Sequence, residues 1–295
     1  MANELNGTIL KGIGGFYYVS TPSGIYECRA RGLFRKQNIT PLVGDRVKLS
    51  SIDENNKTAM LYEILPRTNE LRRHAVSNVT ALVAVIAVEN PRPNLYLLDK
   101  LISSAEKAEI EIIICINKTD LSDGEEYLNI YKSAGFEVVL VSATADKNMA
   151  ELKEKIKDKI CVFAGNSGVG KSSIINNLLG EEIFDTGEIS KKAERGRHTT
   201  RHSELRELPF GGFIIDTPGF GSLEVQSDSE NSLKDTFREF KQYEEGCRFL
   251  DCKHFKEEGC SVIKAVEDKK IQKSRYESYY AMMEDTQTGK NNFRR

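Results

Sequence analysis

A glycine-rich stretch at residues 165–172, GNSGVGKS, has the residue types and spacing that hold nucleotide phosphates. It matches the pattern G-x-x-x-x-G-K-[ST], follows the apolar run ICVFA and precedes the helix-like run SIINNLLG. Its glycines let backbone N–H groups converge on phosphate oxygens, and the helix that follows directs its positive end to the same anion. We expect Lys171 to reach the β- and γ-phosphates and Ser172 to bind Mg²⁺. The residues expected to contact the nucleotide here are Gly165, Asn166, Ser167, Gly168, Val169, Gly170, Lys171, Ser172 and Ser173.

A second motif, NKTD at residues 117–120, has the chemistry to recognise a guanine base. It ends the apolar run EIEIIICI, so Asn117 and Asp120 are expected at the carboxyl edge of a strand, where ligands bind in open α/β sheets. The Asp120 carboxylate can accept hydrogen bonds from both N1–H and the exocyclic amino group of guanine, whereas adenine would leave it unpaired. Asn117 and Lys118 can brace the loop and cover the base.

Two further short motifs accompany this pair. Ser142-Ala143-Thr144, after the run FEVVLV, looks like the loop whose backbone contacts guanine in GTPases, so Ser142 and Ala143 are expected at the base. DTPG at residues 216–219 resembles the D-x-x-G element of the same enzymes. Asp216 would then hold Mg²⁺ through water, and the Gly219 N–H would bind the γ-phosphate.

A cluster of soft ligands lies near the end of the chain: Cys247, Cys252, His254 and Cys260, spaced C-x₄-C-x-H-x₅-C. Three thiolates and one imidazole suit tetrahedral Zn²⁺, and four protein ligands close the coordination sphere, so we expect one structural ion. Disulfides are an alternative that a reducing cytosol disfavours. Unliganded core cysteines are another, but they fit poorly with so polar a segment. The segment has little apolar core, so the metal would supply much of its folding energy.

The elements that must position these motifs fall into three groups. Residues 1–68 contain several short strand-like segments with turn residues between them, which indicates a small barrel. Residues 69–225 alternate apolar strands with amphipathic helices, which is typical of a parallel sheet covered on both faces. Residues 226–295 are polar, with helical spacing expected over 232–244 and 264–284 and the cysteine cluster between them.

Composition limits the function classes. At 39% hydrophobic and 29% charged residues, the 295-residue chain is typical of a soluble globular protein of two or three domains. Its longest apolar run, TALVAVIAV at 80–88, is too short for a membrane span, and the N-terminus lacks the pattern of a secretory signal. We therefore expect a cytoplasmic location and no membrane partner.

The order of the motifs is the most specific signal. In ordinary guanine-nucleotide switches the phosphate loop comes first, but here NKTD and Ser142-Ala143 precede it. Domain ends are often close in space, so a circular permutation is physically tolerable. Motif by motif, the chain resembles the circularly permuted GTPases. With a small barrel in front and a Cys/His cluster behind, it is similar over essentially its whole length to the members that depend on the small ribosomal subunit.

That resemblance implies a multi-domain α/β protein. It would have an N-terminal OB-fold β-barrel (1–68), a central circularly permuted P-loop GTPase with a doubly wound sheet (69–225) and a C-terminal helical zinc-binding domain (226–295). The implied activity is GTP hydrolysis stimulated by the small ribosomal subunit in late 30S maturation. The implied partners are the 30S subunit, its 16S rRNA and GTP or GDP, with the chain a monomer.

The resemblance also assigns roles near residues 196–200, GRHTT. The position where Ras-like switches carry a water-orienting Gln is Phe220 here, so another group must supply that function. His198 matches the histidine of the family's G-x-H-T-T pattern and is the candidate catalytic residue, with His202 as the fallback. Thr200, or else its neighbour Thr199, would coordinate Mg²⁺ in the GTP state.

Both ends of the chain are mildly basic and together are expected to contact RNA. Solvated surface charge is the alternative for the basic residues, and burial in the core is the alternative for the aromatic ones. The last helical stretch offers Arg275 and lysines near Tyr276, Tyr279 and Tyr280. In the barrel, the candidates are Arg29, Arg31, Arg35, Lys36, Arg46 and Lys48 for phosphates and Tyr17, Tyr18 and Phe34 for bases.

Two rival functions remain. One is a P-loop kinase of a small molecule, which has no use for NKTD, DTPG and a zinc module together. The other is a GTP-binding RNA scaffold with negligible hydrolysis, which the phenylalanine at position 220 keeps open.

Overall fold

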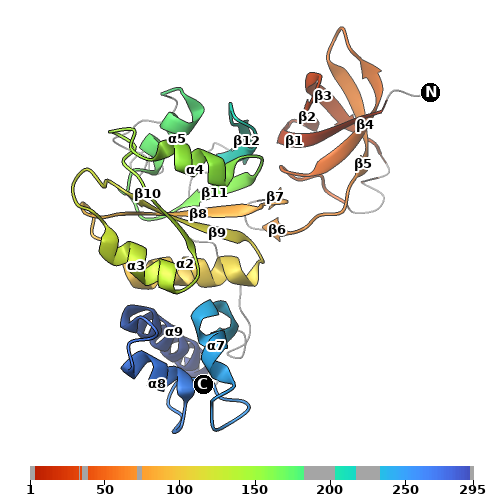
Figure 1. Ribbon diagram of the computed structural model, residues 1–295. Helices are drawn as coiled ribbons and strands as arrows, with labels where there is room; N and C mark the ends of the chain where they lie inside the picture. Colours follow the sequence, from red (N-terminus) through yellow and green to blue (C-terminus); the bar gives the residue numbers. More distant parts are fainter. Residues whose placement is uncertain are drawn as a thin grey trace. The chain divides into compact units, whose positions relative to one another are not determined.

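The computed structural model describes residues 4–32, 34, 39–71, 75–182, 203–216 and 233–292. Figure 1 shows a small barrel, a sheet with helices on both faces and a helical module at the C-terminal end. This architecture confirms the fold class expected from the sequence.

Five strands close the barrel in the order β1-β2-β3-β5-β4. The β3–β5 pair is parallel and the other four pairs are antiparallel. The side chains of Ile9, Val19, Tyr26, Leu49 and Leu61 fill the interior and are fully buried. The strands are β1 (Leu5–Ile13), β2 (Phe16–Thr21), β3 (Gly24–Ala30), β4 (Arg46–Asp53) and β5 (Thr58–Ile64). A closed barrel of this kind confirms the OB-like expectation.

Six strands form a second sheet in the order β10-β9-β8-β11-β13-β12. Its members are β8 (Ala81–Ala87), β9 (Glu111–Asn117), β10 (Glu137–Leu140), β11 (Ile160–Ala164), β12 (Glu204–Glu207) and β13 (Phe213–Asp216). All seven residues of β8 and all five of β11 are buried. β10 pairs with β9 and β11 with β13 in parallel, whereas β12 is antiparallel to β13. The near-continuous apolar runs of the central strands are explained by this burial on both faces.

Helices cover both faces of this sheet, with α2 and α3 on one side and α4 and α5 on the other (Figure 1). They are α2 (Leu95–Lys107), α3 (Glu125–Ser133), α4 (Met149–Ile156) and α5 (Lys171–Leu179). The Asn94 side chain caps α2 by accepting a 3.1 Å hydrogen bond from the Leu97 N–H. A short ladder joins β6 (Glu70–Leu71) to β7 (Val76–Ser77) ahead of β8.

The C-terminal module differs from the sequence-based expectation, because each of the two helices expected there is broken. In place of a helix over 232–244, the described residues form η3 (Lys234–Thr236), η4 (Arg238–Phe240) and α7 (Lys241–Glu244). Phe237 interrupts the helix with φ −107° and ψ 86° and stacks on Phe240, with ring centroids 5.2 Å apart. Burial of these two rings explains the break.

The last stretch is likewise divided, into α8 (Ser261–Glu267) and α9 (Lys273–Asn292). Lys269 adopts a left-handed backbone conformation with φ +59°, and Ile271 turns into the core of the module. Helical spacing alone did not reveal this turn. The core of the module also contains Phe237, Phe240 and Met283, so the expectation that the segment has little apolar core was wrong.

By their contacts, the described residues divide into two compact units. One contains the barrel, β6, β7, β12 and β13, and the other contains β8 to β10, α2 to α5 and the C-terminal module, with the division running through β11. Among the residues described, no helix is long and apolar enough to cross a membrane.

Candidate functional site

Asn117 joins three of the sequence motifs. Its Nδ2 donates to the Val169 carbonyl of the phosphate loop over 2.9 Å, and its Oδ1 accepts from the Ala143 N–H over 3.1 Å. The side chain is 3% exposed, so both hydrogen bonds are protected from water. NKTD, the Ser142-Ala143 loop and the phosphate loop therefore meet at one place, although the chain presents them in reversed order.

The phosphate loop connects β11 to α5, as its motif requires. Gly170 is the left-handed N-cap of α5 at φ +93°, and a Cβ there would lie 2.2 Å from Nδ2 of Asn117. A Cβ at Gly165 would lie 2.1 Å from the Val85 carbonyl oxygen. Both glycines are needed because other parts of the chain approach them too closely for any side chain.

Lys171 folds back over this loop. Its ammonium donates to the carbonyls of Gly165 at 2.7 Å and Asn166 at 2.8 Å, and burial lowers the pKa of the side chain. These carbonyls hold the cation beside the backbone that is expected to carry phosphates. The lysine is thus placed to exchange carbonyl oxygens for phosphate oxygens.

The residues expected to recognise the base are also held in place by hydrogen bonds, starting with Asp120. Its carboxylate accepts a 2.5 Å hydrogen bond from the Ser142 hydroxyl, and this bond is the main cause that lowers the pKa of Asp120. The Ser142 hydroxyl in turn accepts from the Ala145 N–H at 3.2 Å. Asp120 is exposed, with a free side toward solvent, while Lys118 donates to the Asn90 carbonyl in the β8–α2 connection.

Asp216 ends β13, the strand that pairs with β11 through Ile160–Phe213 and Cys161–Ile214. The remaining residues expected at the phosphates and the catalytic water lie outside the described residues. They are His198, Thr199, Thr200, His202, Gly219 and Phe220.

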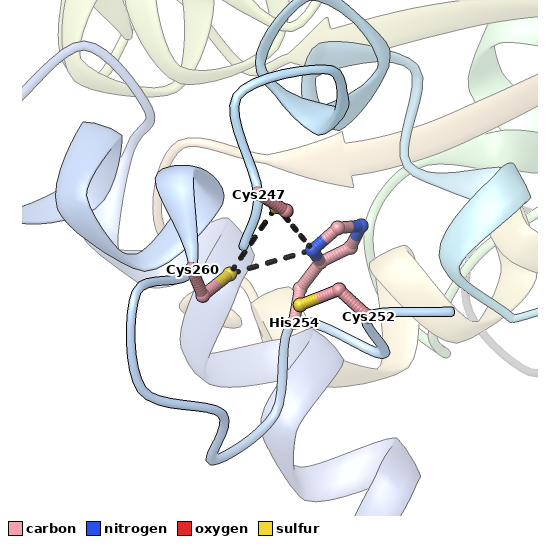
Figure 2. Close-up of side chains that lie close together, drawn as sticks. All are labelled: Cys247, Cys252, His254 and Cys260. Atoms are coloured by element: carbon pink, nitrogen blue, oxygen red, sulfur yellow. Dashed lines mark hydrogen bonds between the residues drawn. The ribbon is translucent and has the colours of Figure 1, made fainter. Parts of the chain in front are cut away.

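The four expected metal ligands come together in the C-terminal module, and their ligand atoms all lie within 4.8 Å of one another (Figure 2). Nδ1 of His254 is 3.6 Å from the Cys247 sulfur and 3.4 Å from the Cys260 sulfur, and the two sulfurs are 3.9 Å apart. A tetrahedral Zn²⁺ with bonds of ~2.3 Å to sulfur and ~2.05 Å to nitrogen places sulfurs ~3.8 Å apart and nitrogen ~3.6 Å from sulfur. The distances among Cys247, His254 and Cys260 therefore fit such an ion, and the Cys252 sulfur within 4.8 Å of them completes a donor set of suitable chemistry.

Neighbouring side chains hold the ligand loop in shape. The Glu257 carboxylate accepts from the backbone N–H groups of Lys253, Phe255 and Lys256 at 2.8–3.0 Å. Tyr276 of α9 donates to the His254 carbonyl at 3.0 Å. His254 itself has a left-handed backbone at φ +56°, which this scaffold maintains.

A buried ionic cluster that sequence reasoning missed joins the C-terminal module to the helices of the sheet domain. Arg275 of α9, 1% exposed, pairs with Asp99 of α2 at 2.6 Å and with Glu239 of η4 at 2.7 Å. Tyr131 donates to the same Asp99 at 3.1 Å. Burial alone would lower the pKa of Arg275, but Asp99 and Glu239 outweigh it, so the guanidinium pKa is raised.

Several expected RNA contacts are wrong, because the side chains are in the interior. Arg275 and Tyr279 are buried in the C-terminal module, and Phe34 is 6% exposed within the barrel core. Arg35 and Lys36 lie outside the described residues. On the barrel's outer surface the Arg29 guanidinium covers the Phe16 ring at 4.8 Å.

Strand β12 contacts part of the same barrel surface. Glu204 pairs with Lys11 at 3.1 Å, and the Ser20 hydroxyl donates to Glu207 at 3.3 Å. The Lys11 ammonium also lies 5.3 Å from the centre of the Tyr18 ring. Tyr18 is therefore partly enclosed by neighbouring side chains within this unit.

Comparison with known proteins agrees with this geometry. Residues 64–226 match the family model of the RsgA GTPase, and residues 6–60 match that of the RsgA N-terminal domain. A curated relative from Ruminiclostridium cellulolyticum, named small ribosomal subunit biogenesis GTPase RsgA, is 47% identical over 277 residues, covering 92% of this chain and 91% of the relative.

Two solved structures share the fold along almost the whole chain. YjeQ from Thermotoga maritima is 33% identical with a TM-score of 0.80, covering 96% of this chain and 98% of that one. YloQ, described as a circularly permuted GTPase, is 36% identical with a TM-score of 0.80, covering 97% and 96%. Together with the reversed motifs that meet at Asn117, these matches show that the chain belongs to the RsgA family of circularly permuted GTPases.

Proposed function

We propose that this chain hydrolyses GTP to GDP and phosphate, and that the small ribosomal subunit stimulates the reaction during late 30S maturation. The observation that carries the enzymatic part is the junction at Asn117, where base-recognition and phosphate-binding motifs meet in a single chain. Relatives named small ribosomal subunit biogenesis GTPase support the ribosomal part.

In the proposed complex, the guanine lies against NKTD and the Ser142-Ala143 loop. Asp120 accepts hydrogen bonds from guanine N1–H and the 2-amino group, and Ser142 fixes the orientation of its carboxylate. Asn117 stays bonded to Val169 and Ala143, and Lys118 covers the base. The phosphates lie on the backbone of residues 165–173, with the Lys171 ammonium at the β- and γ-phosphates and the Gly219 N–H at the γ-phosphate.

Three residues are proposed as the magnesium site: Ser172, Asp216 and Thr200, with Thr199 as the alternative to the last. The ion would neutralise charge on the β- and γ-phosphate oxygens. Ser172 lies in the first turn of α5, and Asp216 is the last residue of β13. A helix start and a strand end are both favourable positions for residues that bind magnesium beside a nucleotide.

For the hydrolytic step we propose His198 as the residue that orients the attacking water, since a phenylalanine stands at position 220. Subunit binding would order the loop that carries this histidine. A His198→Ala protein should bind GTP normally and lose its subunit-stimulated turnover. Full stimulated turnover by that variant would contradict the role.

We further propose that the chain has three domains with different functions: the barrel at 1–68, the GTPase domain at 69–225 and the metal module at 226–295. The family-model matches at 6–60 and 64–226 support the first two of these domains. Barrel and module would contact 16S rRNA of the 30S subunit in the cytoplasm. We propose that the protein acts as a monomer.

The Cys/His cluster is proposed to hold one structural Zn²⁺ through Cys247, Cys252, His254 and Cys260. The spacing of the ligand atoms supports this choice. Four protein ligands leave no open coordination position, so the ion's contribution is to the folding of the module.

The experiment that tests the proposed function is release of phosphate from GTP and from ATP, each with and without purified 30S subunits. We expect slow turnover of GTP alone and strong stimulation by 30S, with no reaction of ATP. Absence of turnover in all four mixtures would favour a GTP-binding RNA scaffold. A small-molecule kinase would instead transfer the phosphoryl group to its substrate. It would be indicated by formation of ADP from ATP, without release of phosphate, in a further mixture that contains a metabolite.

A further inference from the structure

The two ring nitrogens of His254 face different surroundings. Nδ1 points at the sulfurs of Cys247 and Cys260, and Figure 2 shows the other nitrogen on the far side of the ring. That nitrogen, Nε2, lies 3.4 Å from Oε1 of Glu244, the last residue of α7. Nε2 needs a hydrogen-bond partner, and none of the four metal ligands provides one.

An imidazole that binds a metal through one nitrogen is neutral and carries its proton on the other. Here that proton would sit on Nε2, which is buried and makes no hydrogen bond with any residue the structure describes. A buried donor without an acceptor is costly. The loaded site therefore needs an acceptor close to Nε2.

Among the described residues, the charges of Glu244, Lys234 and Glu257 act on the imidazole, and Glu244 is the one suited to accept this hydrogen bond. Lys234 is a donor, and its ammonium is bound to the Cys252 carbonyl at 3.2 Å. The Glu257 carboxylate is occupied by three backbone N–H groups. Glu244 has a side chain 31% exposed and a carboxylate oxygen already next to Nε2.

We propose that Glu244 is the positioning residue of the metal site: its carboxylate accepts the hydrogen bond from Nε2–H and so selects Nδ1 as the metal ligand. Such a partner fixes the tautomer and ring orientation and raises the basicity of the ligating nitrogen. This inference rests on the proposed zinc site and names a residue outside the Cys/His spacing that revealed that site.

The test is the Zn²⁺ affinity of the full chain, measured by competition with a chromogenic chelator. Glu244→Ala should bind Zn²⁺ about 10 to 100 times more weakly than the wild type. Glu244→Gln retains an acceptor oxygen, so its loss should be smaller. Glu245→Ala removes the adjacent exposed carboxylate and serves as the matched control with unchanged affinity.

A second measurement separates positioning from a general loss of folding. Long-range ¹H–¹⁵N NMR of the zinc-loaded wild type and of Glu244→Gln should show Nδ1 bound to the metal and a proton on Nε2. Equal Zn²⁺ affinities of Glu244→Ala and Glu245→Ala, or coordination through Nε2, would overturn the proposal. If the wild-type chain does not bind one equivalent of Zn²⁺, the proposed metal site is wrong, and so is the positioning role of Glu244.

Discussion

Asn117 shows how one side chain can hold a permuted site together. Its amide nitrogen donates to Val169 and its amide oxygen accepts from Ala143, so a single residue connects segments 26 and 52 positions away along the chain. These bonds do not depend on the order in which the chain supplies the segments. At this scale, permutation leaves the chemistry of the site unchanged.

Replacement of Asn117 by alanine should weaken nucleotide binding. The change leaves the Val169 carbonyl and the Ala143 N–H without their partner, and an unpaired buried polar group costs about 1–3 kcal/mol. We therefore expect a Kd for GDP roughly 10 to 100 times higher by titration calorimetry. Asn56→Ala, in an exposed turn of the barrel, is the control, and equal Kd values for the two variants would contradict the role of Asn117.

Residues whose types and spacing suit one particular ligand could be predicted from the sequence. Residues whose role depends on partners far away along the chain could not. The metal ligands were found because thiolates and imidazole at that spacing have few other uses. Arg275 was misassigned to RNA because a charged residue in a helix is usually exposed. Its partners Asp99 and Glu239 lie 176 and 36 positions away, and no local pattern indicates them.

Helix α5 has a glycine at each of its ends. Gly170 at the N-cap and Gly180 at the C-cap both have left-handed backbones, at φ +93° and +71°. Only Gly170 is crowded, with Asn117 occupying the space of a Cβ, while nothing lies within 4 Å of a Cβ at Gly180. The two positions share a conformation and differ in surroundings.

Alanine substitution at these two glycines should therefore have different effects. Gly180→Ala should cost about 1 kcal/mol of folding free energy and leave nucleotide affinity unchanged. Gly170→Ala must displace Asn117 and should reduce binding of a fluorescent GDP analogue at least about tenfold. Binding equally impaired in both variants would show that backbone conformation, and not the contact with Asn117, is what matters.

Element boundaries were predictable where periodicity is strong and uninterrupted. The runs that became β8, β9 and β11 were recognised because burial on both faces of a sheet leaves a clear apolar pattern. The breaks at Phe237 and Lys269 were missed, because tertiary packing of Phe237 and Ile271 decides them and not local propensity.

At the scale of the whole molecule, the buried ion cluster determines how the metal module is attached. Arg275 links α9 to α2 and η4, and further side-chain bonds join Ser103 to Thr236 and Tyr96 to Asp285. The Arg275 cluster and the Ser103–Thr236 bond are buried, so the module is fixed to helices of the GTPase sheet by desolvated contacts, to which the exposed Tyr96–Asp285 bond is added. We expect it to move with those helices and not as a loosely tethered domain.

Replacement of Arg275 by methionine should strongly destabilise the zinc-loaded protein. It leaves Asp99 and Glu239 buried without their counter-charge, a change that typically costs about 3–5 kcal/mol. Lys273→Met, two residues away on α9 and exposed, should change stability by less than about 0.5 kcal/mol. Free energies of unfolding in urea provide the measurement, and similar values for the two variants would refute the structural importance of the cluster.

The most direct test of the whole interpretation is the nucleotide preference of Asp120→Asn, measured as phosphate release from GTP and from XTP in the presence of 30S subunits. Xanthine carries an oxygen where guanine carries the 2-amino group, so an asparagine amide can pair with it and cannot pair fully with guanine. If NKTD and the phosphate loop serve one ligand, the variant should prefer XTP by about 100-fold or more, because each unpaired polar group costs about 1–3 kcal/mol. An unchanged preference for GTP would show that the base does not bind at Asp120 and would contradict a shared site.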